Sequence, residues 1–406
     1  MNHAELVALD HHYTLQTYAR NDVDIDHGSN ATLYDLAGKK YIDFTSGIGV
    51  LSVGTAHPKW VAAITEQAGK LAHISNLYYT QPYAKLAREL CRRTGMAGVF
   101  FGNSGAEANE GLIKLARKYS FDRYGPGRST VLTLNNSFHG RTITTLNATG
   151  QEALHNYFFP FTEGFRYLDA GDFQALAGEE GKGDVCAVLL ELVQGEGGVL
   201  PLEKDYVQAV AETCARNNWL LLVDEVQTGV GRTGTLFAFQ QYGVTPDALS
   251  FAKGIAGGLP MGGFLVGEKC RDTLGAGTHG STFGGNPVCA AGALAVLEIL
   301  DEALLKEVGE KGAYLRRRIE AMALPSLGRT RGLGLMIGVE VAPGYSNKDL
   351  SARLNRAGLL TLTAGPGLRF LPPLTITWEE LDQGLAVLEE TLRGMEEPEF
   401  SDEVRQ

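Results

Sequence analysis

Short apolar runs bounded by turn residues recur along the chain and predict a set of buried strands. The runs are Val99–Gly102, Val131–Leu134, Val185–Glu191, Trp219–Val223, Ala248–Ala252 and Gly262–Gly267. Continuous apolar runs of this length are typical of strands that are buried on both faces of a parallel sheet. In an open parallel sheet, such strands deliver their last residues to one crevice at the carboxyl edge. The pattern therefore predicts where functional side chains gather.

A helical pattern follows the first of these runs. Its apolar face is formed by Ala108, Leu112, Leu115, Ala116 and Tyr119. Ser104, just before this face, is a natural N-cap, and Gly105 lets the backbone approach a ligand closely. The free amides and the dipole of a first helical turn favour an anion. Ser104, Gly105 and Ala106 are therefore candidate phosphate ligands, although the same three residues alone also fit an ordinary capped turn.

Two further patterns mark the ends of the chain. Residues 32–44 alternate apolar and polar positions on both sides of a glycine turn, which predicts a β-hairpin. From about Asp301 the order becomes helix, strand at 334–341, helix, strand and helix, which predicts a separate α/β domain. Thr377 and Glu380 have the spacing of a capping box at the start of the last helix.

Two of the apolar runs lead to ionisable residues, the first to Asp224 and the second to Lys253. Their expected meeting at the sheet edge suits pyridoxal 5'-phosphate (PLP), whose aldehyde needs a lysine amine and whose ring nitrogen needs an anion that keeps it protonated. Lys253 follows Ser-Phe-Ala and precedes Gly254, a poorly solvated setting that lowers the pKa of a lysine and frees its amine. The alternative is a solvent-facing lysine and a capping aspartate.

Residues after the run Val131–Leu134 offer a second part of such a site. Phe138 could stack on one face of a flat cofactor ring. Arg141 is placed to hold a substrate carboxylate through its bidentate fork. The alternatives are a core phenylalanine and a surface arginine.

The stretch Asp224–Gly229 (DEVQTG), followed by Gly231–Gly234 (GRTG), resembles the signature of class III (ω-amino acid) aminotransferases. The resemblance covers about 33–392. It implies that Lys253 forms the Schiff base with PLP, that Asp224 pairs with the pyridinium nitrogen, and that Gln227 contacts the ring hydroxyl. The position of Ser104, Gly105 and Ala106 before Asp224 and Lys253 in the chain favours their role as phosphate ligands.

The resemblance assigns further roles. It implies that Phe138 stacks on the ring and that Arg141 binds the α-carboxylate of the substrate. Glu196 would mask Arg369 when an ω-amino substrate is bound, and release it for the carboxylate of glutamate or 2-oxoglutarate. Thr282 would reach the cofactor phosphate of a neighbouring subunit, and Ser281 would lie near the substrate. The enzyme would then be active only as a homodimer, with active sites at the interface.

The implied α/β architecture is the type I PLP-dependent transferase fold. It has a large domain, with a mostly parallel seven-stranded sheet flanked by helices, and a smaller α/β domain. On this basis residues 1–50 form an N-terminal segment that joins the small domain, 51–300 the large PLP-binding domain, 301–395 the small domain, and 396–406 an acidic tail.

Within the family, the resemblance is closest to enzymes that act on N-acetylornithine. It implies transfer of the terminal amino group of N-acetylornithine to 2-oxoglutarate, giving N-acetylglutamate semialdehyde and glutamate, a step of arginine biosynthesis. Ornithine, 4-aminobutyrate, succinyl-diaminopimelate and a carrier-bound lysine precursor are alternative donors. A PLP aminomutase is a more distant alternative, against which Arg369 and Glu196 argue.

The composition of the chain indicates which classes of protein and which partners can be excluded. Of the 406 residues 44% are hydrophobic and 20% charged, which is typical of a globular protein of two or three domains. The net charge of −11 argues against nucleic acid as a partner. The five cysteines show no Cys-x-x-Cys spacing, and we expect neither disulfides nor a metal site. No signal peptide or membrane-spanning run is recognised, so the expected location is the cytoplasm.

Overall fold

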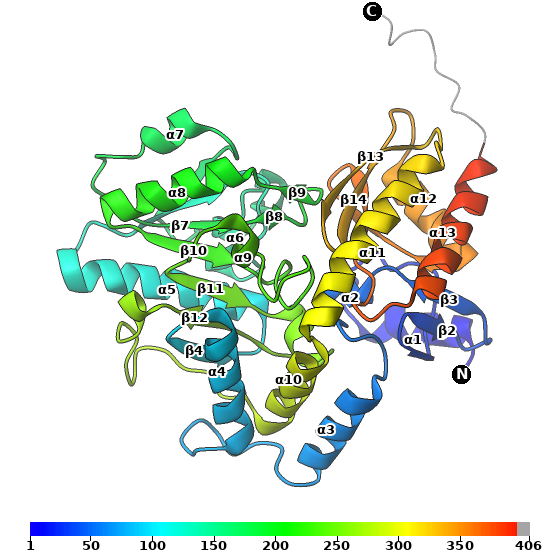
Figure 1. The fold of residues 1–406 in the computed structure, drawn as a ribbon, viewed down its shortest axis with the longest axis horizontal. Coiled ribbons are helices and arrows are strands. Elements are labelled where there is room, and N and C mark those ends of the chain that lie inside the picture. Colours follow the sequence, from blue (N-terminus) through cyan, green and yellow to red (C-terminus); the bar gives the residue numbers. More distant parts are fainter. Residues whose placement is uncertain (396–406) are drawn as a thin grey trace, which may run out of the picture.

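The computed structural model describes residues 1–395, which form a large and a small lobe joined near the middle of the molecule (Figure 1). The acidic tail expected at 396–406 lies outside the described residues. None of the helices in residues 1–395 is long and apolar enough to cross a membrane.

A seven-stranded sheet forms the centre of the large lobe and confirms the expected α/β architecture. Its strands, in spatial order, are β4 (Gly98–Gly102), β12 (Gly262–Val266), β11 (Ala248–Phe251), β10 (Leu220–Asp224), β7 (Val185–Glu191), β5 (Thr130–Leu134) and β6 (Phe165–Leu168). Only β12 runs antiparallel to its neighbours. The edge strand β6 was absent from the expected runs because three of its four residues are not buried, so it lacks a continuous apolar signal.

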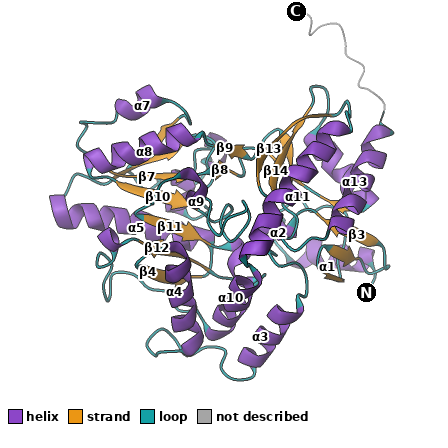
Figure 2. Ribbon diagram, in the orientation of Figure 1, coloured by secondary structure: helices purple, strands orange, loops and turns teal. Residues whose placement is uncertain are grey.

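Helices lie on both sides of this sheet (Figure 2). The side chains of its central strand β10 alternate between the two sides. On β10, Leu220 and Leu222 pack in the cluster that contains helix α5 (Gly105–Tyr124), whereas Leu221 and Val223 pack in the cluster that contains α8 (Lys204–Asn217). Because the side-chain period of a strand is two, the next residue on the α5 side is Asp224. This alternation decides which helix faces the carboxylate.

The other elements of the large lobe surround this sheet. They are α3 (Pro58–Ala68), α4 (Gln81–Thr94), α6 (Ile143–Ala148), α7 (Phe173–Ala177), α9 (Phe239–Tyr242), α10 (Pro287–Ile299), the two-stranded ribbon β8 (Val193–Gln194) and β9 (Leu200–Pro201), and short 3-10 turns η1 (Glu152–Leu154), η2 (Lys253–Ala256) and η3 (Glu268–Cys270). Helix α10 begins at Pro287, as expected, with Asn286 as its side-chain cap.

The small lobe contains a four-stranded antiparallel sheet covered by long helices. Its elements are β13 (Leu327–Leu333), β14 (Met336–Val341), β17 (Gly367–Phe370) and β16 (Leu362–Ala364), with α11 (Glu302–Ala321), α12 (Asn347–Ala357) and α13 (Trp378–Arg393). The single strand expected at 334–341 was wrong at its start, because Gly334 and Leu335 form a turn between β13 and β14. Strand β13 is an edge strand with only one buried residue, so its polar sequence gave no apolar pattern from which a strand could be predicted.

The N-terminal segment joins the small lobe through a second sheet. The expected hairpin is present as β2 (Thr32–Tyr34) and β3 (Lys40–Asp43), extended by β1 (His27–Ser29) on one side and by β15 (Leu359–Leu360) on the other. The expected capping box at Thr377 is also present, and its Glu380 accepts hydrogen bonds from Asn30 and Thr32. Helix α1 (His3–Tyr13) buries no residue, and α2 (Ser46–Gly49) leads into the large lobe.

Candidate active site

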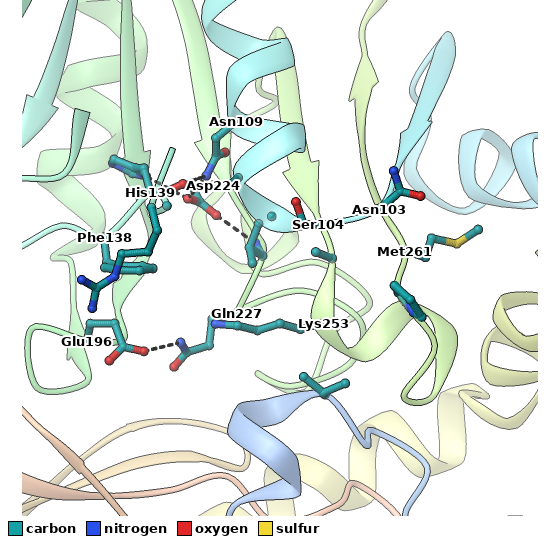
Figure 3. Close-up of a pocket in the computed structure, with 18 of the residues that line it drawn as sticks. Asn103, Ser104, Asn109, Phe138, His139, Glu196, Asp224, Gln227, Lys253 and Met261 are labelled. Carbon is teal, nitrogen blue, oxygen red and sulfur yellow. Dashed lines mark hydrogen bonds and ion pairs between the residues drawn. The ribbon is translucent and has the colours of Figure 1, made fainter. Parts of the chain in front are cut away.

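A pocket of about 450 Å³ opens at the carboxyl ends of β7, β10 and β11 (Figure 3). Apart from Val50, the residues that line it end or follow the strands β4, β5, β7, β10 and β11, or directly precede β12. The lining residues are Val50, Asn103–Ala106, Asn109, Phe138–Arg141, Glu191, Glu196, Asp224, Val226, Gln227, Ala252, Lys253 and 258–261. In the part of the chain that the structure describes, no cluster of histidine, cysteine and carboxylate side chains could hold a metal ion.

Asp224 is the centre of a buried hydrogen-bond network (Figure 3). Its Oδ2 accepts from Asn109 Nδ2 at 2.7 Å and from His139 Nδ1 at 2.8 Å, and its Oδ1 accepts from the Val226 amide at 2.9 Å. Asn109 lies on α5, the helix that the strand alternation places over this carboxylate. Because His139 donates through Nδ1, its tautomer and ring orientation are fixed by Asp224.

Glu191 is a second buried carboxyl group beside Asp224. The two residues are register partners on β7 and β10, so their side chains lie on the same face of the sheet. Burial, with the neighbouring charge of Asp224, raises the pKa of Glu191 to about 7. Its oxygens accept from the amides of Phe138 and Gly195. Glu191, His139 and Asn109 were not among the site residues expected from the sequence, although Glu191, like Asp224, lies at the end of an apolar run.

Lys253 projects into the same pocket just after β11. Its backbone has φ +43°, in the left-handed region that is strained for a residue with a long side chain, as is common at functional sites. Its side-chain amine makes no hydrogen bond or ion pair with any residue between 1 and 395. Burial lowers the pKa of the Lys253 amine, and the nearby Glu196 carboxylate only partly opposes this. A larger fraction of this amine is therefore neutral than of an ordinary lysine at the same pH.

The N-terminus of α5 forms one wall of the pocket. Ser104 is the N-cap, and its hydroxyl accepts from the Glu107 amide. The amides of Gly105 and Ala106 donate to no other residue that the structure describes, and both residues line the pocket. A Cβ on Gly105 would lie 2.7 Å from Val226, so this glycine is needed where the helix meets the loop after β10. Two free amides at a helix N-terminus are suited to a phosphate.

An ion pair joins this pocket to the small lobe. Arg369 Nη1 on β17 donates to Glu196 Oε1 at 2.6 Å and to Gln227 Oε1 at 3.2 Å. Arg369 is buried behind Glu196 and does not itself line the pocket. Burial would raise the pKa of Glu196, but Arg369, together with smaller effects of Lys253 and Gln227, holds this pKa below its usual value.

The remaining candidates lie at different distances from the pocket. Phe138 and Arg141 both line it, with the Arg141 guanidinium 5.5 Å from the centre of the Phe138 ring. Ser281 does not line the pocket but contacts a residue that does, since its hydroxyl accepts a hydrogen bond from Asn103 Nδ2 at 3.2 Å. Thr282 is exposed and takes no part in lining this pocket.

These groups fit PLP. A lysine amine with a lowered pKa, a buried carboxylate held by three N–H donors, and two free helix amides converge on one cavity. They match the aldehyde, the ring nitrogen and the phosphate of that cofactor. Together with a mostly parallel sheet that holds this cavity at its carboxyl edge, these groups indicate the class of PLP-dependent transferases.

Comparison with known proteins gives the family. The family model described as aminotransferase class-III matches residues 15–392. Acetylornithine aminotransferase of Haemophilus ducreyi is 51% identical, over 97% of this chain and 100% of that protein. The crystal structure of ornithine aminotransferase from Toxoplasma gondii superimposes with a TM-score of 0.93 at 34% identity, over 97% of this chain and 95% of that chain. For acetylornithine aminotransferase from Elizabethkingia anophelis the TM-score is 0.88 at 33% identity, over 97% and 100%.

The chain belongs to the class-III aminotransferases. It is therefore a PLP-dependent transaminase, which moves an amino group from a donor to a keto acid. The resemblance noted in the sequence is confirmed at the level of family, fold and cofactor.

Proposed function

We propose that this enzyme transfers the terminal amino group of N-acetylornithine to 2-oxoglutarate, giving N-acetylglutamate semialdehyde and glutamate in arginine biosynthesis. The observation that carries the proposal is the 51% identity, over nearly the whole chain, with an acetylornithine aminotransferase. The ion pair between Glu196 and Arg369 also supports the proposal, because the two substrates differ in whether a carboxylate lies next to the reacting carbon.

PLP, when bound, supplies an aldehyde for amines and a ring that accepts electrons from the adjacent carbon. In our proposal Lys253 holds the cofactor through its amine. With its amine free, Lys253 would move the proton at the reacting carbon of the substrate, a role for which a lysine of lowered pKa is suited. Asp224, oriented by Asn109 and His139, keeps a proton on the ring nitrogen.

The other pocket residues hold and orient the cofactor. Ser104, Gly105 and Ala106 would bind its phosphate at the N-terminus of α5, where the amides of the last two are free. Phe138 would stack on the ring, and Gln227 would contact the ring hydroxyl. Both line the pocket, Phe138 from the loop after β5 and Gln227 from the loop after β10.

Substrate carboxylates would bind two arginines. Arg141 at the pocket wall would hold the α-carboxylate of N-acetylornithine. Arg369 would bind the carboxylate next to the reacting carbon of glutamate or 2-oxoglutarate, after Glu196 has moved away. The 2.6 Å contact between Glu196 and Arg369 corresponds to the arrangement for the donor, which has no carboxylate at that carbon.

We further propose that the active unit is a homodimer. The loop before α4 exposes Leu77, Tyr78 and Tyr79, and Phe283 is exposed on the loop 281–284 to which Asn76 donates two hydrogen bonds. Apolar side chains gathered in this way are typical of a protein interface. Thr282, exposed in the same loop, would then reach the cofactor phosphate of the other subunit, with Ser281 near the substrate.

The five free cysteines are compatible with a reducing compartment such as the cytoplasm.

A donor panel tests the proposed reaction. Initial rates would be measured with 2-oxoglutarate and each of N-acetylornithine, ornithine, 4-aminobutyrate and succinyl-diaminopimelate, with Lys253→Ala as the inactive control. We expect the highest kcat/KM for N-acetylornithine. A higher value for ornithine would replace the proposed donor by that of the Toxoplasma gondii relative, and turnover without a keto acid would instead indicate an aminomutase.

A further inference from the structure

One row of the small sheet contacts the loop that carries Glu196 at two points. Arg331 on β13, Gly338 on β14 and Arg369 on β17 are register partners across three adjacent strands. Directly opposed residues of neighbouring strands point to the same face of a sheet. Two arginines therefore flank a glycine on one face, and both donate hydrogen bonds to the segment 195–198.

The two contacts differ in kind. Arg369 Nη1 donates to the carboxylate of Glu196, a side chain that can rotate away. Arg331 Nε donates to the backbone carbonyl of Gly198 at 2.9 Å, which cannot leave without moving the loop. The Arg331 guanidinium is itself held by Glu340 on β14, through Nη1 to Oε1 at 2.6 Å. Arg331 is thus a fixed attachment of the loop, and Arg369 is a releasable one.

The glycine between the arginines makes room for this attachment. A Cβ at Gly338 would lie 2.8 Å from the Gly198 carbonyl oxygen and 2.9 Å from Val199 Cβ. The loop backbone therefore lies directly on the sheet. Gly365 gives a second close approach, since a Cβ there would lie 2.9 Å from the Gly197 oxygen. The position of the loop relative to Arg369 is set by backbone contacts with the same sheet.

From this geometry we infer that Arg331 is a positioning residue for the Glu196–Arg369 pair and so sets the preference between the two substrates. By holding Gly198, it fixes the point from which the Glu196 side chain reaches Arg369. A donor without a carboxylate at its reacting carbon needs Arg369 covered, because an unpaired buried guanidinium is costly. A dicarboxylate supplies its own partner. This inference rests on the proposed function of the pair.

The test compares two half-reactions of the holoenzyme, with N-acetylornithine and with glutamate, each followed by the absorbance of the cofactor. In Arg331→Met we expect kcat/KM for N-acetylornithine to fall about tenfold, the size of one charge-assisted hydrogen bond. We expect the value for glutamate to stay the same or rise. The quantity compared is the ratio of kcat/KM for N-acetylornithine to kcat/KM for glutamate. Arg331→Lys, which keeps a hydrogen-bond donor, should restore part of this ratio. Glu340→Gln should lower it, as Arg331→Met does.

Arg329→Met is the matched control, because Arg329 lies exposed on the same strand and its side chain makes no hydrogen bond or ion pair within residues 1–395. Its ratio should equal that of the wild type. Equal losses in both half-reactions, or an unchanged ratio in all Arg331 and Glu340 variants, would overturn the inference. If Arg331→Met does not fold, the Lys and Gln variants decide. A wild type that rejects N-acetylornithine refutes the proposed donor instead, and the ratio is then measured with the ω-amine it accepts.

Discussion

Lys253 combines three properties that a lysine on the surface would not have. It lies in a strained backbone conformation, its amine has no partner within residues 1–395, and burial lowers its pKa. The nearby Glu196 carboxylate raises this pKa, and Arg369 lowers it. The balance of these charges makes the reactivity of Lys253 dependent on the pair that we assign to substrate selection.

The first prediction concerns the pH dependence of this amine. In enzyme freed of cofactor, the rate at which an amine-reactive reagent labels Lys253 should rise at lower pH than for an ordinary lysine, because only the neutral amine reacts. Glu196→Gln removes the opposing negative charge and should move the midpoint to still lower pH. Peptide mapping by mass spectrometry measures both, with the exposed Lys348 as the internal reference. A midpoint that rises in Glu196→Gln would contradict the assigned cause.

The second prediction concerns Asp224. Asp224→Asn keeps the shape of the side chain but removes the charge that is proposed to keep the ring nitrogen protonated. We expect turnover to fall about 10²–10³-fold, as is typical when one electrostatic contact to the reacting group is lost. Ser250→Ala is the control, since Ser250 Oγ contacts the same carboxylate at only 3.4 Å, near the limit of a hydrogen bond. Comparable losses in both variants would mean that packing, not charge, is responsible.

At the scale of elements, the site depends on where strands and helices end. Strands β7 and β10 bring Glu191 and Asp224 to the same row, and α5 begins opposite them. The small lobe likewise depends on the end of a helix, because the N-terminus of α13 contacts the N-terminal segment. Glu380, three residues into α13, accepts from the Thr377 amide in its capping box and from Asn30, Ala31 and Thr32 of the N-terminal segment.

The third prediction follows from this double role. Glu380→Ala should lower the free energy of unfolding by about 2–3 kcal/mol, because it removes charge-assisted bonds to two segments at once. Glu379→Ala is the matched control in the same helical turn, since within residues 1–395 the Glu379 side chain accepts a hydrogen bond only from Gln383. Its effect should stay within about 0.5 kcal/mol. Urea denaturation followed by circular dichroism measures the difference. Equal effects would mean that the capping box does not join the segments.

For the whole molecule, the exposed apolar loops imply a surface that is covered in the active form. The fourth prediction is that the enzyme sediments at twice its chain mass of 43.7 kDa. Leu77→Asp, which charges a side chain 86% exposed in the single chain, should shift it toward the monomer and reduce turnover. Leu36→Asp, on an exposed turn of the N-terminal hairpin, should leave both unchanged. A wild-type monomer with full activity would exclude the role proposed for Thr282.

Much of this protein was determined by its sequence alone. Apolar runs between turns predicted six of the seven strands of the large sheet, because strands buried on both faces leave a continuous signal. The positions of Asp224 and Lys253 after two such runs indicated their meeting at the carboxyl edge. The caps Ser104, Thr377 and the proline at 287 were readable because they act within one helical turn.

Other features were decided only by the tertiary structure, because they join residues far apart along the chain. The contacts of Asp224 with Asn109 and His139 depend on how α5 packs on the sheet, and the neighbourhood of Glu191 depends on strand register. The row of Arg331, Gly338 and Arg369 arises only when three strands pair. Local patterns record which face of an element is buried, whereas the partner across that face is chosen by packing of the whole chain.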